Sequence, residues 1–178
     1  MKRSIAFAVL LTLAALPLAA EARASRDELA ALEKQFDSRI WAYNINDPFD
    51  LLGTTRGVCL EGYGVVFTAE LNLVAGAVIT PFRSTFSPEQ IQQLRQKKLE
   101  RLEEVKSIMR TMLLESAAAL REIPLSQRIA VGVTLSRFSW EDSRGLPAQI
   151  LMEATRQSLL DIQLGNVSAN DAIEVKEF

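Results

Sequence analysis

The chain has 178 residues, of which 48% are hydrophobic, and its 20 Lys and Arg residues face 22 Asp and Glu residues for a net charge of −2. It contains no histidine and a single cysteine, Cys59. These counts exclude His-dependent catalytic triads, His-ligated metal sites, an internal disulfide and Cys-based zinc sites. A nucleic-acid-binding protein usually carries clustered excess Lys and Arg. We therefore expect no cofactor, no metal and no nucleic-acid partner.

The first 22 residues have the pattern of a bacterial-style signal peptide. Two basic residues precede an uncharged apolar run of 14 residues at positions 5–18, and small residues at positions 20, 22 and 24 fit the signal peptidase pattern. We predict cleavage after Ala22 or Ala24. An uncleaved membrane anchor is the alternative, but the run is shorter than the ~20 residues that span a bilayer. We expect an exported protein, periplasmic or secreted, with no membrane span after signal cleavage.

The remainder, residues 25–178, is expected to form a single domain that begins with a helix and a hairpin. A capping box at Ser25, followed by apolar residues at helical spacing, predicts a helix over about residues 26–40. Residues 65–73 alternate strictly between apolar and polar. They follow a shorter apolar stretch at 58–60 and a glycine-flanked break, and this pattern predicts a β-hairpin.

The second half of the chain adds a long helix and further alternating segments. Ser87 starts another capping box with proline at the first helical position, which predicts a helix from there to about Glu122. Residues 128–138 alternate and predict a strand that has small residues on one face. Residues 147–165 are predicted to form a further helix, and residues 172–178 a short strand at a sheet edge.

This order of elements, α-β-β-α-β-α-β, predicts an α+β fold. The expected architecture is a single-domain, two-layer sandwich. In it an antiparallel sheet of about four strands packs against one long and two shorter helices.

The long helix is longer than the sheet on which it must lie. About 35 helical residues span roughly 52 Å, whereas strands of ten residues span about 33 Å. Its amino-terminal half, residues 88–106, is densely charged and is expected to overhang the sheet. An apolar stripe there, which includes Leu94, Leu99 and Leu102, must be covered. Either the helix over residues 26–40 packs on it, or the stripe forms a homodimer or partner-protein interface.

The candidates for recognition are Tyr63, Phe82 and Arg83. Tyr63 is expected to lie exposed at the tip of the hairpin, where its flanking glycines serve a tight turn. Phe82 and Arg83, in the loop before the long helix, are candidates for the lip of a ligand site. Trp41 and Tyr43 are expected to close the core rather than to bind a ligand.

Carboxylates are the remaining strong acid–base groups, and Glu70 is the weak catalytic candidate because glutamate is mildly disfavoured within a strand. A glycosidase-like site needs a second carboxyl group about 5–9 Å away, and sequence spacing does not identify one. Solvated surface charge is the alternative interpretation. Cys59 is expected to be a passive thiol, since no histidine is present to act as its base, and an intermolecular disulfide is the alternative.

Together these patterns favour binding over catalysis. We expect an exported, non-catalytic domain that binds another protein or an envelope component. The alternative is a small carboxylate-dependent hydrolase that acts on envelope carbohydrate, and a small-ligand sensor is a third hypothesis. Two converging carboxylates in a pocket would support the hydrolase, whereas an exposed apolar patch would support the binding domain.

Overall fold

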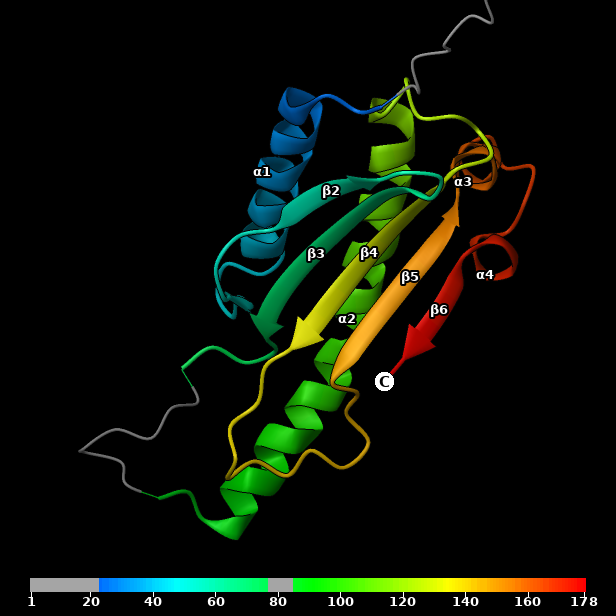
Figure 1. The fold of residues 1–178 in the computed structure, drawn as a ribbon. Helices are drawn as coiled ribbons and strands as arrows, with labels where there is room; N and C mark the ends of the chain where they lie inside the picture. Colours follow the sequence, from blue (N-terminus) through cyan, green and yellow to red (C-terminus); the bar gives the residue numbers. More distant parts are fainter. Residues whose placement is uncertain (1–22, 77–84) are drawn as a thin grey trace, which may run out of the picture.

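The computed structural model describes residues 23–76 and 85–178, which form a six-stranded sheet with helices packed on one face (Figure 1). The predicted signal peptide, residues 1–22, and the loop residues Phe82 and Arg83 lie outside the described residues. In chain order the elements are α1 (Arg26–Ala42), β1 (Asp50–Leu51), β2 (Arg56–Leu60), β3 (Gly64–Asn72), α2 (Pro88–Ala119), β4 (Arg128–Leu135), β5 (Gln149–Thr155), α3 (Arg156–Gln163), α4 (Ala169–Ala172) and β6 (Glu174–Glu177).

The two longest helices begin where the sequence predicts them. At the start of α1 the Ser25 hydroxyl accepts a hydrogen bond from the Glu28 amide at 3.2 Å, and the Glu28 carboxylate accepts one from the Ser25 amide at 2.8 Å. Ser87 and Gln90 form the same reciprocal pair at the start of α2. Each capping box satisfies two amide donors that the first helical turn leaves unpaired.

The predicted hairpin is confirmed as β2 and β3, which pair in antiparallel register with Val58 opposite Val66. The glycine that begins β3 is required by its surroundings. Gly64 has a φ of 132°, and a Cβ atom there would lie 2.0 Å from the carbonyl oxygen of Arg128. Only glycine therefore allows β3 and β4 to approach each other at this point.

The prediction of a purely antiparallel sheet of about four strands is wrong in both respects. The strand order is β1-β3-β4-β5-β6. Strand β2 also pairs with β3, along the same edge as β1. Strands β3 and β4 are parallel, from Gly64 opposite Arg128 to Leu71 opposite Leu135. They are parallel because α2 returns the chain to the end of the sheet at which β3 starts. The two-residue strand β1 is too short to produce an alternating pattern.

The predicted helix over residues 147–165 is also wrong in its first half. Residues 149–155 form β5, and α3 begins only afterwards, where the Thr155 hydroxyl accepts a hydrogen bond from the Ser158 amide at 3.2 Å. Within β5 the side chains of Ile150, Met152 and Ala154 are buried in the core. This spacing of two is the periodicity of a strand.

The core lies between the sheet and the helices. On α1, Phe36 is completely buried, and its ring meets that of Phe67 on β3 edge to face with 4.9 Å between the centroids. The other large, fully buried side chains come from all the layers: Ile40, Phe49, Leu71, Met109, Met112, Leu113, Leu120, Ile129, Ile150 and Met152.

The amino-terminal turns of α2 extend beyond the ends of the strands, as the length mismatch predicts (Figure 1). Leu102 is buried there, and Leu94 and Leu99 are partly buried. The β4–β5 connection, residues 136–148, packs against this part of the helix. In particular, the Lys98 ammonium donates to the Glu141 carboxylate at 2.5 Å, and both side chains are 3% exposed.

The expectation that α1 covers the overhanging stripe is therefore wrong. Helix α1 packs instead beside the carboxyl-terminal half of α2, where Gln35 donates to Glu115 at 3.1 Å and Arg39 forms an ion pair with the same carboxylate. A local stripe shows that a surface needs a cover, but it does not show which distant segment supplies the cover.

The packing of α1 can be tested with two aromatic positions on the same helix. We expect Phe36→Ala to lower the free energy of unfolding by about 3–5 kcal/mol, because it leaves a cavity in the core. Trp41 is 55% exposed, so Trp41→Ala should change it by no more than about 0.5 kcal/mol. Urea unfolding followed by circular dichroism measures both values. Equal losses in the two variants would contradict the orientation of α1.

Candidate functional site

The sheet face opposite the helices carries a cluster of charged side chains around Glu153. Because side chains alternate along a strand, Arg128 on β4, Glu153 on β5, and Glu174 and Lys176 on β6 project to this same face. Tyr63 reaches the cluster from the hairpin between β2 and β3. The topology thus brings together residues that are up to 113 positions apart, from Tyr63 to Lys176.

Glu153 is the centre of this cluster and is only 7% exposed. Its carboxylate accepts hydrogen bonds from the Tyr63 hydroxyl at 2.5 Å and from the Lys176 ammonium at 3.0 Å, and the Arg128 guanidinium lies 3.3 Å away. Glu174 pairs with the same two cations, at 2.9 Å from Lys176 and 3.4 Å from Arg128. Two carboxylates and two cations therefore neutralise one another.

The environment fixes the protonation states of Glu153 and Tyr63. The hydrogen bond from Tyr63, together with Lys176 and Arg128, holds the pKa of Glu153 below its ordinary value despite the opposing effect of burial. Burial first, and then the hydrogen bond to Glu153, raises the pKa of Tyr63 to about 12. Glu153 is thus ionised and Tyr63 protonated near neutral pH. A general acid needs the opposite shift, a raised carboxyl pKa.

The structure places Tyr63 differently from the sequence prediction, since it is partly buried and bonded within the chain rather than exposed at a tip. Sequence reasoning also missed Glu153, which lies in the segment predicted as a helix. Its alternation with Met152 and Ala154 is the signal that could have identified it.

Glu70 lies exposed on the open sheet face, beside Thr134 of β4. It lines a shallow cavity of about 300 Å³ together with Leu52, Thr54, Arg56, Thr68, Ala69 and Thr134. None of these neighbours carries a carboxyl group. The structure thus does not bring a second carboxylate into the cavity that Glu70 lines.

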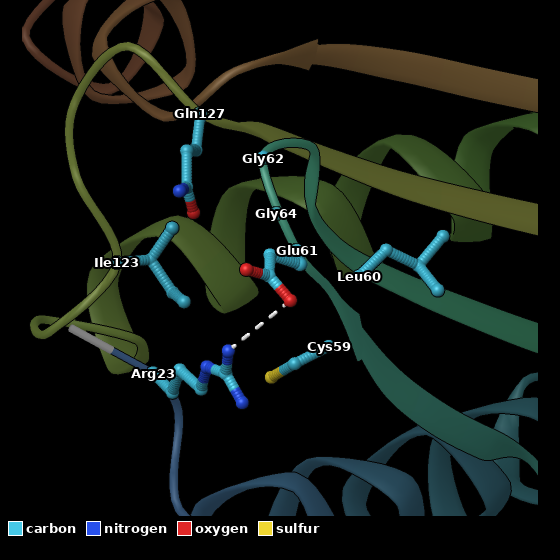
Figure 2. A pocket seen from close by; sticks show the side chains of 8 residues that line it. All are labelled: Arg23, Cys59, Leu60, Glu61, Gly62, Gly64, Ile123 and Gln127. Atoms are coloured by element: carbon cyan, nitrogen blue, oxygen red, sulfur yellow. Dashed lines mark ion pairs between the residues drawn. The ribbon is translucent and has the colours of Figure 1, made fainter. Parts of the chain in front are cut away.

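A further cavity of about 280 Å³ lies between the β2–β3 hairpin and the segment that follows α2 (Figure 2). The residues that line it are Arg23, Cys59, Leu60, Glu61, Gly62, Gly64, Ile123 and Gln127. Figure 2 shows Arg23, Glu61 and Cys59 on one side and the Gln127 amide on the other. Arg23 lies 3.5 Å from Glu61, and both side chains are largely exposed. The Cys59 thiol donates to the Ala24 carbonyl at 3.8 Å.

This cavity has the size of a small-ligand site, but its two charged side chains pair with each other and its thiol bonds to the Ala24 carbonyl. The two charged side chains pair at its rim, and such exposed pairs contribute only about 0–1 kcal/mol. The thiol bonds to a backbone carbonyl rather than to a base. The geometry therefore identifies no nucleophile in this cavity.

Among residues 23–76 and 85–178, three exposed large apolar side chains lie within one short segment at the end of α1. Trp41 is 55% exposed, Tyr43 is 44% exposed and Ile45 is 84% exposed. We call these three residues the apolar tip. The expectation that Trp41 and Tyr43 close the core is wrong, because Phe49 fills the neighbouring core position and is 1% exposed.

The apolar tip belongs to a folded segment. The Asn44 side-chain oxygen accepts hydrogen bonds from the amides of Asn46 at 3.2 Å and Asp47 at 3.3 Å, which closes a turn around Ile45. Trp and Tyr are enriched among the residues that dominate binding energy at protein interfaces. Large apolar side chains that are exposed within one short segment make that segment a candidate interaction site.

Comparison with models of known protein families, with curated proteins and with solved structures gave no match to this chain. Within residues 23–76 and 85–178, no helix combines the length and apolar character of a membrane span. The same residues contain no group of three or more His, Cys, Asp or Glu side chains placed to hold a metal ion. Functional inference therefore depends on the geometry of the charged cluster, the cavity and the apolar tip.

Glu153→Gln tests the role of the charged cluster. The variant should lose about 1–3 kcal/mol of folding free energy at neutral pH, because Lys176 and Arg128 lose their shared carboxylate. Since folding lowers the pKa of Glu153 below its ordinary value of 4.5, its contribution is present above that pH and is lost as the pH falls further. Denaturant unfolding at several pH values should therefore show a weaker acid dependence in the variant. Glu70→Gln, on the same face, is the matched control, and an equal loss there would contradict the assignment.

The protonation state of Tyr63 can be measured directly, because Tyr43 is the only other tyrosine in the chain. In a Tyr43→Phe variant, tyrosinate absorbance should report Tyr63 alone and rise with a midpoint near pH 12. In Tyr43→Phe combined with Glu153→Gln the midpoint should fall, since the neighbouring anion is removed. A midpoint near 10, the ordinary value, would show that Tyr63 is not bonded to Glu153.

Proposed function

We propose that the protein is an exported, non-catalytic binding domain that recognises another protein or an envelope component through the apolar tip. The observation that carries the proposal is the exposure of Trp41, Tyr43 and Ile45, at 55%, 44% and 84%. A folded protein gains about 25 cal/mol for each Å² of apolar surface that it removes from water. These side chains contribute little of that gain within the chain and are available to contribute it to a complex.

The state of the carboxylates supports binding rather than turnover. Glu153 and Glu174 converge, but Arg128 and Lys176 neutralise them, and the pKa of Glu153 is lowered. The carboxylate-dependent hydrolase stays a prediction, and the residues that line a cavity with Glu70 offer no second carboxyl group to support it.

The location of the proposed interface differs from the sequence-based hypothesis. A homodimer or partner contact through residues 88–106 stays a prediction, but Leu102 is buried there, and Leu94 and Leu99 are partly buried within the chain. We therefore place the contact at the apolar tip. The export component of the proposal rests on the signal-peptide pattern of residues 1–22.

A capture experiment with a matched control tests this proposal. The tip variant carries Trp41→Ala, Tyr43→Ala and Ile45→Ala, and the control variant carries Leu125→Ala, Leu164→Ala and Val167→Ala. The three control side chains are also exposed, at 45%, 74% and 42%, and they belong to the α2–β4 and α3–α4 connections. The baits are purified from the exported fraction, so their recovery there also tests export.

From envelope extract, the wild-type chain and the control variant should retain the same specific component. The tip variant should retain it at least about tenfold less, because loss of central aromatic anchors costs more than 1.4 kcal/mol of binding free energy. Equal retention by the tip variant would disprove the assignment of the interface.

A further inference from the structure

We propose that Arg101, on the overhanging part of α2, braces the apolar tip and neutralises its segment, so that the tip fits a protein partner with an uncharged apolar pocket. The choice of partner rests on the proposed function. The bracing can be measured without any partner. We define the tip segment as residues 41–49, which comprise the last two residues of α1 and its connection to β1.

Arg101 bonds to consecutive residues of the tip segment. Its side chain is 5% exposed, and its guanidinium donates to the Asp47 carbonyl at 2.7 Å, to the Asp47 carboxylate at 3.3 Å and to the Pro48 carbonyl at 3.4 Å. The guanidinium carbon also lies 4.1 Å from the centroid of the Phe49 ring. The Arg101 side chain thus contacts the backbone of Asp47 and Pro48 and the side chains of Asp47 and Phe49.

The rest of the tip segment folds against this fixed end. The turn closed by Asn44 precedes Asp47 directly, and the ring of Tyr43 lies 5.8 Å from that of Phe49. Arg101 and the turn together therefore determine where Tyr43 and Ile45 project. Anchors that are ordered before binding avoid about 0.5–1.5 kcal/mol of ordering cost for each side chain.

Several of the charges near the tip are paired within the protein. Asp47 is the only charged residue of the tip segment. Its carboxylate accepts from Lys97 at 2.8 Å, and Lys97 and then Arg101 hold its pKa below the ordinary value. Arg101 also lies 3.6 Å from Glu104, and Arg39 pairs with Glu115. The one charged residue of the tip segment and the cations Arg39, Lys97 and Arg101 near it therefore already have partners within the protein.

This pairing distinguishes between two kinds of partner. Segments that bind bilayer surfaces combine aromatic residues with cations that face anionic headgroups. Here the cations Arg39, Lys97 and Arg101 are held by carboxylates. An apolar pocket on a protein matches such a surface, and its binding should change little with ionic strength.

Hydrogen–deuterium exchange on the full chain tests the bracing. In Arg101→Met the amides of residues 44–47 and of Phe49 should exchange at least about tenfold faster than in the wild type, because the bonds to two carbonyl groups are lost. Arg101→Lys should give an intermediate rate, since an ammonium lacks the planar fork of donors. Lys97→Met is the control and should leave these amides close to the wild-type rate, because Lys97 pairs with the Asp47 carboxylate and not with the backbone carbonyl groups that Arg101 binds.

The amides of β3 and β4 separate bracing from a general loss of stability. Faster exchange confined to the tip segment supports the proposal, and a uniform increase across both strands overturns it. An unchanged tip in Arg101→Met also overturns the bracing.

The partner class is tested with the component that the wild-type chain captures and with vesicles of phosphatidylcholine, with and without an anionic phospholipid. Retention of a protein that is equal at low and high salt, and about tenfold weaker with Arg101→Met, supports the proposal. Binding to vesicles that is lost with Trp41→Ala overturns the protein partner in favour of a bilayer. If the wild-type chain captures nothing, the partner class fails together with the proposed function, and the exchange result decides the bracing separately.

Discussion

A parallel pair of strands needs a crossover that carries the chain back along the sheet, and the 32 residues of α2 make this crossover between β3 and β4. The helix is about 48 Å long, whereas β3, the longest strand, has nine residues and spans about 30 Å. The excess length forms the overhang. Lys98 binds the β4–β5 connection there through Glu141, and Arg101 binds the tip segment. The helix that the parallel pairing requires as a crossover thus also orders two long connections.

The edge strand β2 depends on α1 in a comparable way. The Glu33 carboxylate accepts from the Gly57 amide at 2.8 Å, and the Arg26 guanidinium, paired with Glu33, donates to the Gly57 carbonyl at 3.3 Å. Side chains of a helix thereby replace the neighbouring strand that an exposed edge would otherwise recruit. The same contacts fix α1 against the sheet, and hence they fix the position of Trp41 at its end.

The features that the sequence predicts correctly are local ones. Capping boxes at Ser25 and Ser87 and the glycines around Tyr63 act over a few residues, so the two long helices and the hairpin could be recognised. The parallel pairing of β3 with β4 depends on residues more than 60 positions apart. The pattern of residues 147–165 predicts a helix throughout, because β5 runs directly into α3. The sequence does not predict the partners of Glu153 or the exposure of Trp41. It shows whether a side chain is apolar or charged, but it does not show which residues the fold places against that side chain.

The absence of histidine leaves carboxylates as the strong acid–base groups of this chain, and the fold uses several of them as connectors. Folding lowers the pKa of Glu33, Asp47 and Glu153, in each case through a hydrogen bond to a neighbouring side chain. Neighbouring cations hold these carboxylates as anions, and the resulting pairs stabilise the arrangement of the elements. Acid catalysis, in contrast, needs a carboxyl group that keeps its proton. These polar interactions therefore act within the chain and connect its elements. The pairs that make these connections are Arg26–Glu33, Arg101–Asp47, Lys98–Glu141 and Lys176–Glu153.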